Sequence, residues 1–460
     1  MLRAKTLVSI GVECKDVAVT TEPRPPRALA RVLFSPWAIT VAFVAVHAWL
    51  IQDAWKWKPQ IFGDVGLYEW WVRNGISTGH WPVFDESWVY PVGALLAITP
   101  PAWFSQTPDG YAWVWLSLVT ALDAVATVFL VRARPRGPLG AWFWLIFLLA
   151  LGPIFLGRLD GVIAPVILLA LVISARHPAV AMTLATLGAW IKIAPGAAAV
   201  AIAATARSWT GFARHVVLPG AVVSVLVIGW ALVMGSGSRV LDVFGEQSDR
   251  ALQVEAVGAT PFLLMGLNNP EYDPVWNDVI YTYEILGAAP GALAEALDIA
   301  LPLVVLLLAA LAWFAVRRRP ERAHDVLLLV AAAELLALIV FNKVGSPQFI
   351  AWIGPPVAVA IALYGGGTAA ARRTWLPPAL GMLVTAYLTY LIFPVRYGEF
   401  LGGFQYMIVV GAVRNGLLVA LLLGAIVRLV QIAVASPHRE AEPVPEPAAA
   451  PALQKEQDDT

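Results

Sequence analysis

The chain has 460 residues, of which 59% are hydrophobic and only 13% are charged. Soluble domains carry about 25% charged residues, so this composition excludes an ordinary soluble domain and predicts that most of the chain lies in lipid. Lys and Arg together number 31, as do Asp and Glu, and a neutral chain offers no positive field for nucleic acid. The single cysteine, Cys14, excludes disulfide frameworks, thiol-ligated zinc and iron–sulfur clusters, because each needs several sulfur atoms.

Apolar runs long enough for membrane helices recur along the whole chain. A helix needs about 20 apolar residues to cross the hydrocarbon core. Runs of this kind lie at about 36–52, 112–131, 139–156, 161–175, 179–192, 193–206, 216–234, 298–316, 324–341, 349–364, 375–394 and 405–432. They predict an all-α polytopic membrane protein with about 12 transmembrane helices. The fifth and sixth runs are short and predict a kinked or re-entrant hairpin around 192–196.

The arginines between these runs predict the orientation, since Lys and Arg are retained on the cytoplasmic side. With twelve crossings, one face carries all the arginine-rich segments: Arg24/Arg27/Arg31, Arg132/Arg134/Arg136, Arg176, Arg207/Arg214, Arg317/Arg318/Arg319/Arg322, Arg372/Arg373 and the tail around Arg439. Both termini are then cytoplasmic. The moderately apolar stretch 89–104 is not expected to cross, because counting it would invert every later loop.

Three regions follow from this topology. Residues 1–35 are expected to form a disordered cytoplasmic arm rather than a secretory signal, because acidic residues precede the first apolar run. Residues 36–432 form the transmembrane domain, and the Pro-, Ala- and Glu-rich residues 433–460 form a disordered cytoplasmic tail. Two large extracytoplasmic loops, about 53–110 and 236–297, hold most carboxylates outside the tails. Long polar loops of this kind often carry function.

Four short motifs occur in order along the transmembrane domain. Asp64 follows the first apolar run, with Tyr68 four residues later and Gly79-His80-Trp81-Pro82 and Tyr90-Pro91 downstream. The other motifs are Lys192-Ile193-Ala194-Pro195, the segment Arg250-Ala251-Leu252-Gln253-Val254-Glu255, and Lys343-Val344-Gly345-Ser346-Pro347-Gln348. Over about 36–430 this pattern resembles the GT-C superfamily of membrane glycosyltransferases, and within it glycosyltransferase family 87, the polyprenyl-phosphate-mannose-dependent mannosyltransferases of actinobacterial cell envelopes. One departure is Gly157-Arg158-Leu159-Asp160-Gly161, where a Gly-Gln-x-Asn-like turn is expected.

The resemblance implies a GT-C-like fold and an inverting transfer of mannose from polyprenyl-phosphate-mannose to a mannosylated lipid or lipoglycan at the outer face. It implies that Asp64 is the general base. Position alone favours a different role, because an Asp before Val65 is a good cap for a short interfacial helix.

Four cations lie where positive-inside sorting does not explain them: Arg158, Lys192, Arg250 and Lys343. A cation at membrane depth is costly unless it is paired, so each is a candidate to hold the phosphate of a lipid-linked donor. The alternatives are a snorkelling side chain or a structural ion pair such as Arg250 with Glu255.

Further candidates for substrate binding are Tyr68, His80, Asp160, Gln253, Glu255 and Gln348. Glu255 and Asp160 are placed to position acceptor hydroxyls, and His80 to exchange a proton near neutral pH, although a loop histidine is often simply solvated. Asp123 and Glu334 lie inside predicted spans, which favours structural pairing.

The motifs favour a donor without a nucleotide. No Gly-rich loop opens a helix in the Walker or Rossmann pattern, and no His/Cys cluster has metal-ligand spacing. We expect no resident cofactor, while a divalent ion on an outer carboxylate such as Asp64 stays open. The expected partners are a polyprenyl-phosphate sugar, a glycolipid or lipoglycan acceptor and membrane lipids.

Two alternatives remain. Twelve spans with both termini inside also suit a transporter or lipid flippase, with a broken helix near Pro195. Against this, the large outer loops follow spans 1 and 7 without a repeat of the Asp64 motif. The closer alternative is a transferase for another polyprenyl-phosphate sugar such as arabinofuranose.

Overall fold

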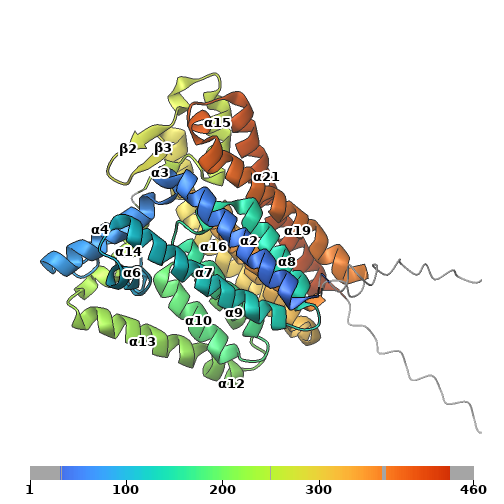
Figure 1. Ribbon diagram of the computed structural model, residues 1–460. Helices are drawn as coiled ribbons and strands as arrows, with labels where there is room; N and C mark the ends of the chain where they lie inside the picture. Colours follow the sequence, from blue (N-terminus) through green and yellow to red (C-terminus); the bar gives the residue numbers. More distant parts are fainter. Residues whose placement is uncertain (1–31, 33, 249, 365–368, 436–460) are drawn as a thin grey trace, which may run out of the picture.

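The computed structural model describes residues 32, 34–248, 250–364 and 369–435 and is mostly helical (Figure 1). The predicted arm and tail, with Arg24, Arg27, Arg31 and Arg439, lie almost wholly outside the described residues.

A helix covers each of the twelve apolar runs. The helices are α2 (Pro36–Lys56), α7 (Pro108–Arg132), α8 (Gly137–Leu151), α9 (Asp160–Ile173), α10 (Pro178–Ile191), α11 (Pro195–Ala204), α12 (Trp209–Phe212) continuing into α13 (Leu218–Val233), α16 (Ala288–Arg318), α17 (Ala323–Val340), α18 (Gly354–Tyr364), α19 (Ala369–Tyr390) and α21 (Gln405–Val434). Within the described ranges, eight helical segments are long and apolar enough to cross a membrane. The four helices α8–α11 are shorter, so their crossing stays a prediction.

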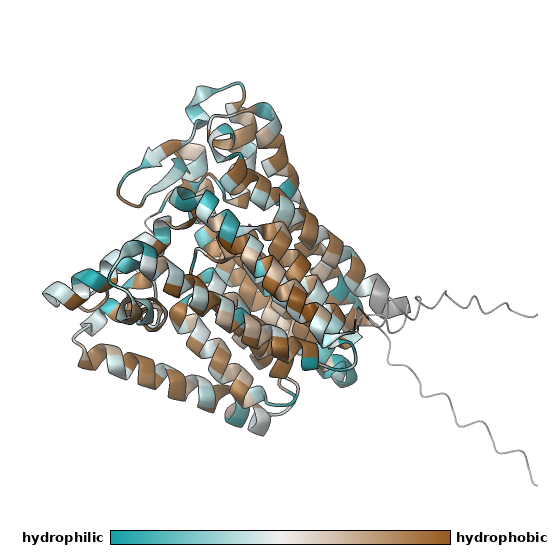
Figure 2. Ribbon diagram, in the orientation of Figure 1, coloured by the Kyte–Doolittle hydropathy of each residue, from teal (hydrophilic) through white to brown (hydrophobic). Residues whose placement is uncertain are grey.

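The bundle has a buried centre and a lipid-facing rim. The segments containing α17 and α18 are each 83% buried, whereas the segment containing α13 is 11% buried. Figure 2 shows the long helices as predominantly hydrophobic along their length. In a membrane an exposed apolar surface faces lipid, so the outer helices need no further cover.

Helices α10 and α11 form the predicted broken hairpin. The backbone of Lys192 is extended (φ −158°, ψ 144°) where α10 ends, and α11 begins at Pro195. Proline disfavours helical backbone in the residue before it and lacks the N–H that a continuing helix needs. The two helices pack against each other, which brings Lys192 to the end of the hairpin.

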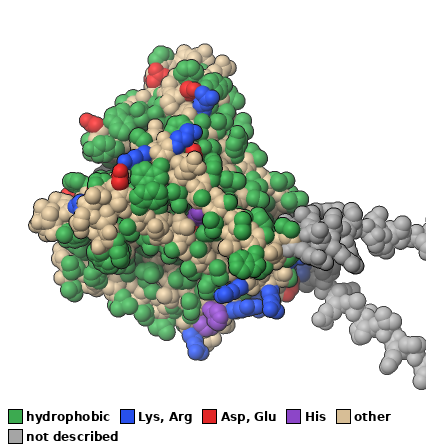
Figure 3. Space-filling view, in the orientation of Figure 1, with side chains coloured by type: hydrophobic (Ala, Val, Ile, Leu, Met, Phe, Trp, Pro, Cys, Tyr) green, Lys and Arg blue, Asp and Glu red, His purple; other side chains and the backbone are tan. Residues whose placement is uncertain are grey.

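The ends of the helices group as an up-and-down order requires. The Arg136 N–H donates to the Ala362 carbonyl over 2.8 Å, and His324 Nδ1 lies 3.1 Å from the Tyr364 hydroxyl. These contacts place the start of α8, the end of α18 and the start of α17 together. In Figure 3, Lys, Arg and His side chains gather at the lower end of the visible face, beside α12. Which face of the membrane this end adjoins stays a prediction.

The loop predicted at 53–110 is a set of short helices, which are α3 (Lys58–Ile61), α4 (Gly63–Thr78), α5 (Ala94–Ile98) and α6 (Pro100–Phe104). Helices α5 and α6 together belong to the shorter apolar helices, so the expectation that 89–104 does not cross stays a prediction.

The loop predicted at 236–297 contains a small sheet that the sequence did not reveal. It holds α14 (Asp242–Ser248), β1 (Leu252–Gln253), α15 (Thr260–Gly266), β2 (Val275–Asn277) and β3 (Thr282–Ile285), and the antiparallel strand order is β1-β3-β2. The strands are two to four residues long, too short for an alternating pattern to be seen. The sheet lies beside α15 at the top of Figure 1.

Candidate functional site

A cavity of about 1210 Å³ is lined by residues from the two large loops, 53–110 and 236–297, and from three helix breaks. Eight of the predicted site residues line it: Asp64, Arg158, Lys192, Arg250, Gln253, Glu255, Lys343 and Gln348. They come from segments far apart in the chain, so the fold collects the four sequence motifs around one space.

Asp64 lies in the first turn of α4 and is held by Arg158. Arg158 Nε is 3.1 Å from Asp64 Oδ2, and the Asp64 side chain keeps 32% of its surface exposed. The same guanidinium donates to the backbone carbonyls of Gln60 (3.0 Å) and Ile61. A Cβ at Gly157 would run into the Ile61 carbonyl, so this close approach requires glycine. The partner of Asp64 is therefore a rigidly held arginine and not the amide of a helix that it caps.

An aromatic wall lies behind Asp64. Tyr68 is buried, and its hydroxyl accepts a hydrogen bond from the Leu159 N–H over 3.4 Å. Its ring packs on those of Trp71 (6.2 Å between centroids) and Tyr90 (6.1 Å), both of which line the cavity. Burial raises the pKa of Tyr68 and Tyr90, so both hydroxyls stay neutral and act as hydrogen-bonding groups.

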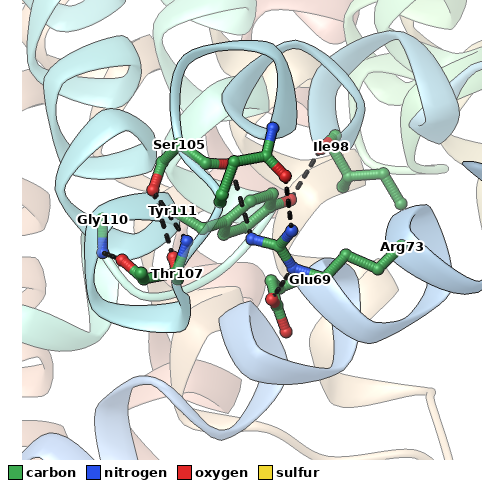
Figure 4. A network of polar contacts seen from close by, with 8 residues as sticks. Glu69, Arg73, Ile98, Ser105, Thr107, Gly110 and Tyr111 are labelled. Carbon is green, nitrogen blue, oxygen red and sulfur yellow. Dashed lines mark hydrogen bonds and ion pairs between the residues drawn. The ribbon is translucent and has the colours of Figure 1, made fainter.

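A polar network fixes α4 against the loop that precedes α7 (Figure 4). Glu69 and Arg73 pair on α4, and Arg73 also donates to Gln106 Oε1 (3.3 Å) and to the Ser105 carbonyl (3.4 Å). Glu69 is thus used to anchor the helix that carries Asp64. Glu69 and Asp64 do not form a paired site, because each has its own arginine partner and residues five apart on a helix lie about 140° apart around its axis.

Lys192 and Asp160 form a buried pair beside the cavity. Lys192 Nζ donates to Asp160 Oδ2 over 2.7 Å, and Asp160 Oδ1 accepts from Trp352 Nε1 over 2.6 Å. Asp160 is fully buried, so the structure places it behind Lys192 and not against the acceptor space. The ammonium also lies 5.3 Å from the ring centroid of Phe349. The pair holds the lysine at the cavity wall.

Lys343, in the fourth sequence motif, contacts residues of the loop 236–297 and of α16. Its Nζ donates to Asp298 Oδ2 over 2.7 Å, and its carbonyl accepts from the Gln253 N–H over 2.9 Å. Two residues later, a Cβ at Gly345 would overlap the backbone of Glu255 and Ala256. The close contact between these two backbones places Lys343 beside Gln253, and Gln348 lines the same cavity.

Arg250 differs from the other three cations. Across the described ranges, no carboxylate lies within ion-pair distance of its guanidinium, and its buried Nε has no hydrogen-bond partner. The expected alternative pair with Glu255 is not formed. Glu284 lies nearby but accepts from the Ala251 N–H (3.0 Å) and Asn277 Nδ2 (2.8 Å). Burial lowers the pKa of Arg250, which reflects the cost of holding this charge out of water.

Glu255 lies in the loop 236–297, and its carboxyl group is buried. Burial raises the pKa of Glu255 to about 7, against the opposing effects of Arg414 and a hydrogen bond with Tyr397. Arg414 Nη2 donates to the Glu255 carbonyl over 2.9 Å. Sequence reasoning missed Arg414 and Tyr397. Arg414 lies within the last apolar run. An arginine inside a predicted membrane helix is the sequence signal that could have identified it, because a charge at that depth needs a partner.

The remaining candidates lie away from the cavity. His80 does not line it, and its Nε2 is 3.4 Å from Glu86 Oε2 with nearly half of its side chain exposed. Asp123 has the structural partners expected for it, His47 at 3.3 Å and Trp144 Nε1 at 2.7 Å. Glu334 is buried, and neither carboxyl oxygen finds a hydrogen-bond partner among the residues described.

In the part of the chain that the structure describes, no three His, Cys, Asp or Glu side chains gather to hold a metal ion. A divalent ion held by Asp64 together with a bound substrate would need no such group, so that expectation is not tested.

Comparison with known proteins supplies no relative. No family model, curated protein or solved structure matches the chain.

Proposed function

We propose that this protein is an inverting membrane glycosyltransferase, with Asp64 as general base, that transfers mannose from polyprenyl-phosphate-mannose to a mannosylated lipid or lipoglycan at the extracytoplasmic face. The observation that carries the proposal is the composition of the cavity. The partly exposed carboxylate of Asp64 lines the same space as Arg158, Lys192, Lys343 and Arg250, and among the described residues Arg250 has no carboxylate within ion-pair distance.

The reaction needs one displacement at the anomeric carbon. The acceptor oxygen attacks C1 of the sugar on the face opposite the phosphate, and the bond between C1 and the phosphate oxygen breaks. Polyprenyl phosphate departs with the electron pair, and the acceptor hydroxyl proton passes to the Asp64 carboxylate. A single displacement inverts the configuration, so a β-linked donor yields an α-mannoside.

The cations match the charge that develops on the leaving phosphate. Donors that are already held in place stabilise such charge without reorganisation, and arginine suits phosphate because its guanidinium offers parallel donors. Arg250 accepts a phosphate without breaking an existing ion pair, whereas Lys192 and Lys343 are already held by Asp160 and Asp298. Trp71 and Tyr90 present aromatic surface to a sugar ring.

The cavity also has an apolar side for a prenyl chain. Leu301 of α16 and Leu338 of α17 line it. From these residues towards the other end of the bundle, the side chains of both helices are mostly apolar. A lipid-linked donor has its phosphate near the polar end of such helices and its chain along them, which is the arrangement that the cavity lining supports.

A transfer assay with the purified full chain, synthetic polyprenyl-phosphate-mannose and a mannoside acceptor tests the proposal. Loss of the base in Asp64→Asn should lower turnover about 10²- to 10⁴-fold. Asp109→Asn is the matched control, because Asp109 is an exposed carboxylate paired with Lys58 outside the cavity lining. Unchanged turnover by Asp64→Asn would refute the base assignment.

The same assay separates the alternatives. Transfer from polyprenyl-phosphate-arabinofuranose but not from the mannose donor would replace the donor sugar and keep the mechanism. Movement of the lipid-linked sugar across liposome membranes without transfer to any acceptor would refute the enzyme and establish the transporter.

A further inference from the structure

A second cavity of about 670 Å³ lies among α17, α18, α19 and α21 and shares no lining residue with the first. Its walls are almost wholly apolar. Four lining residues have small or no side chains, which leaves open space between the facing helices: Gly381, Ala420, Gly424 and Ala425. Helices α19 and α21 lie side by side in Figure 1. The volume falls within the range of about 300–1,000 Å³ that is typical of ligand pockets.

One end of this second cavity is polar. Its lining there includes Thr374, near the start of α19, and Arg428 and Gln431, near the end of α21. Arg428 donates from Nη1 to Gln431 Oε1 (3.0 Å) and from Nη2 to Thr374 Oγ1 (2.9 Å). Its buried Nε has no hydrogen-bond partner, and no carboxylate in the described part of the chain lies within ion-pair distance.

The polar end lies with the arginine-rich end of the bundle. Helix α19 follows the end of α18, whose Tyr364 contacts His324 at the start of α17. Asp64 lies at the other end of the bundle, where α2 ends and α7 begins. The second cavity is therefore separate from the transferase site proposed above and does not depend on it.

We propose that this cavity binds an anionic phospholipid, with an acyl chain between α19 and α21 and the phosphate on Arg428. In a membrane, an apolar crevice is filled by lipid chains, because water gains nothing by entering it. Among the described residues the partners of the Arg428 guanidinium are neutral, and a charge that no anion balances is costly beside an apolar cavity; a phosphate is the anion that its planar donors fit best. Phosphatidylglycerol supplies both the chain and the net negative charge.

Native mass spectrometry of the full chain, purified in detergent and titrated with phosphatidylglycerol or phosphatidylcholine, tests this site. Wild type should retain phosphatidylglycerol at least tenfold more tightly than phosphatidylcholine. Arg428→Gln should lose that preference, while Arg214→Gln, an exposed arginine outside the cavity, should keep it. Equal retention of the two lipids by wild type, or an unchanged preference in Arg428→Gln, would overturn the proposal.

A pair of glycines on one helix gives a control that is independent of charge. Gly424 lines the cavity and Gly416 does not, and a Cβ at either position meets no atom within 4 Å. Gly424→Leu should fill the cavity and weaken binding of both lipids tenfold or more, whereas Gly416→Leu should bind as wild type does. Full binding by Gly424→Leu would refute the site. Inorganic phosphate that displaced the lipid and protected the protein from heat equally well would show an anion site without a lipid.

Discussion

At the scale of single residues, the cations around the first cavity differ in whether a carboxylate already neutralises them. Arg158, Lys192 and Lys343 each have such a partner at 3.1 Å or less, and Arg250 has none among the residues described. A cation that is paired in this way holds its carboxylate in position, in addition to any contact that it makes with a phosphate. An unpaired and partly buried cation is stabilised most by an anionic substrate, because binding replaces the lost hydration.

Arg250→Gln should therefore weaken donor binding more than it slows turnover. A hydrogen bond to a charged group contributes about 1.5–3 kcal/mol, so KM for polyprenyl-phosphate-mannose should rise about tenfold to a hundredfold. Arg396→Gln is the control, since Arg396 pairs with Glu399 outside the cavity lining. Steady-state kinetics measures both variants. An unchanged KM with a reduced kcat would contradict a role in ground-state phosphate binding.

Glu255 should make stability depend on pH. Burial raises its pKa to about 7 from the ordinary value of 4.5, so between these values the folded protein keeps a proton that the unfolded chain has released. This contribution to stability is full below about pH 4.5 and is lost as the pH rises to 7, an effect on the order of 3 kcal/mol.

The melting temperature of the purified protein from pH 5 to 8 checks this expectation. Wild type should lose stability with rising pH relative to Glu255→Gln, whose side chain has similar shape and no charge. Glu271→Gln, at an exposed position of the same loop, should follow wild type. Parallel curves for wild type and Glu255→Gln would show that Glu255 does not titrate in this range.

At the scale of elements, two loops from different parts of the chain form one wall of the site. The Gln253 N–H donates to the Lys343 carbonyl, and the Val254 N–H donates to the Tyr283 carbonyl over 3.0 Å. The segment after α17 is thus hydrogen-bonded to β1 of the small sheet in the loop 236–297. Apolar periodicity located α17 but not this contact, because backbone hydrogen bonds between distant segments leave no pattern in side-chain hydropathy.

Gly345→Ala should damage this wall. The added Cβ would overlap the backbone of Glu255 and Ala256, and relief by shifting the two segments should cost about 1–3 kcal/mol. We expect a lower melting temperature and reduced transfer activity, because Lys343 and Glu255 move apart. Gly398→Ala, where a Cβ meets no atom within 4 Å, should leave both unchanged. Equal behaviour of the two variants would contradict the close packing.

At the scale of the whole molecule, the site depends on the two loops sharing one side of the membrane. The twelve helical segments and the grouping of their ends fit that arrangement, and the crossing of α8–α11 is the part that hydropathy and length do not establish. These four helices are short, but α8 and α9 are largely buried by neighbouring helices. Burial in protein relaxes the need for each helix to match the full lipid thickness.

Cysteine labelling in intact cells tests the topology. In a Cys14→Ser background, Ser77→Cys at the end of α4 should react with a membrane-impermeant maleimide from outside. Thr210→Cys in α12 should react only after permeabilisation, since both positions are exposed but belong to opposite ends of the bundle. Labelling of both variants from the same side would require a different number of crossings between them.

The sequence alone determined what depends on local composition. Hydropathy located the eight described helical segments that are long and apolar enough to cross a membrane, because about 20 apolar residues in a row have few other stable environments, and proline placed the break after Lys192. Local motifs also singled out eight residues that line the first cavity. None of these patterns indicated which charges pair.

Only the tertiary structure decided that Arg158 holds Asp64, that Arg250 has no carboxylate partner in the described part of the chain, and that Asp160 lies behind Lys192. It also brought Arg414 to the carbonyl of Glu255, 159 residues away, and Trp352 to Asp160, 192 residues away. Ion pairs and hydrogen bonds act over a few ångströms between segments that the chain order leaves far apart. Their pairing, and with it the chemistry open to the cavity, is therefore a property of helix packing and not of local sequence.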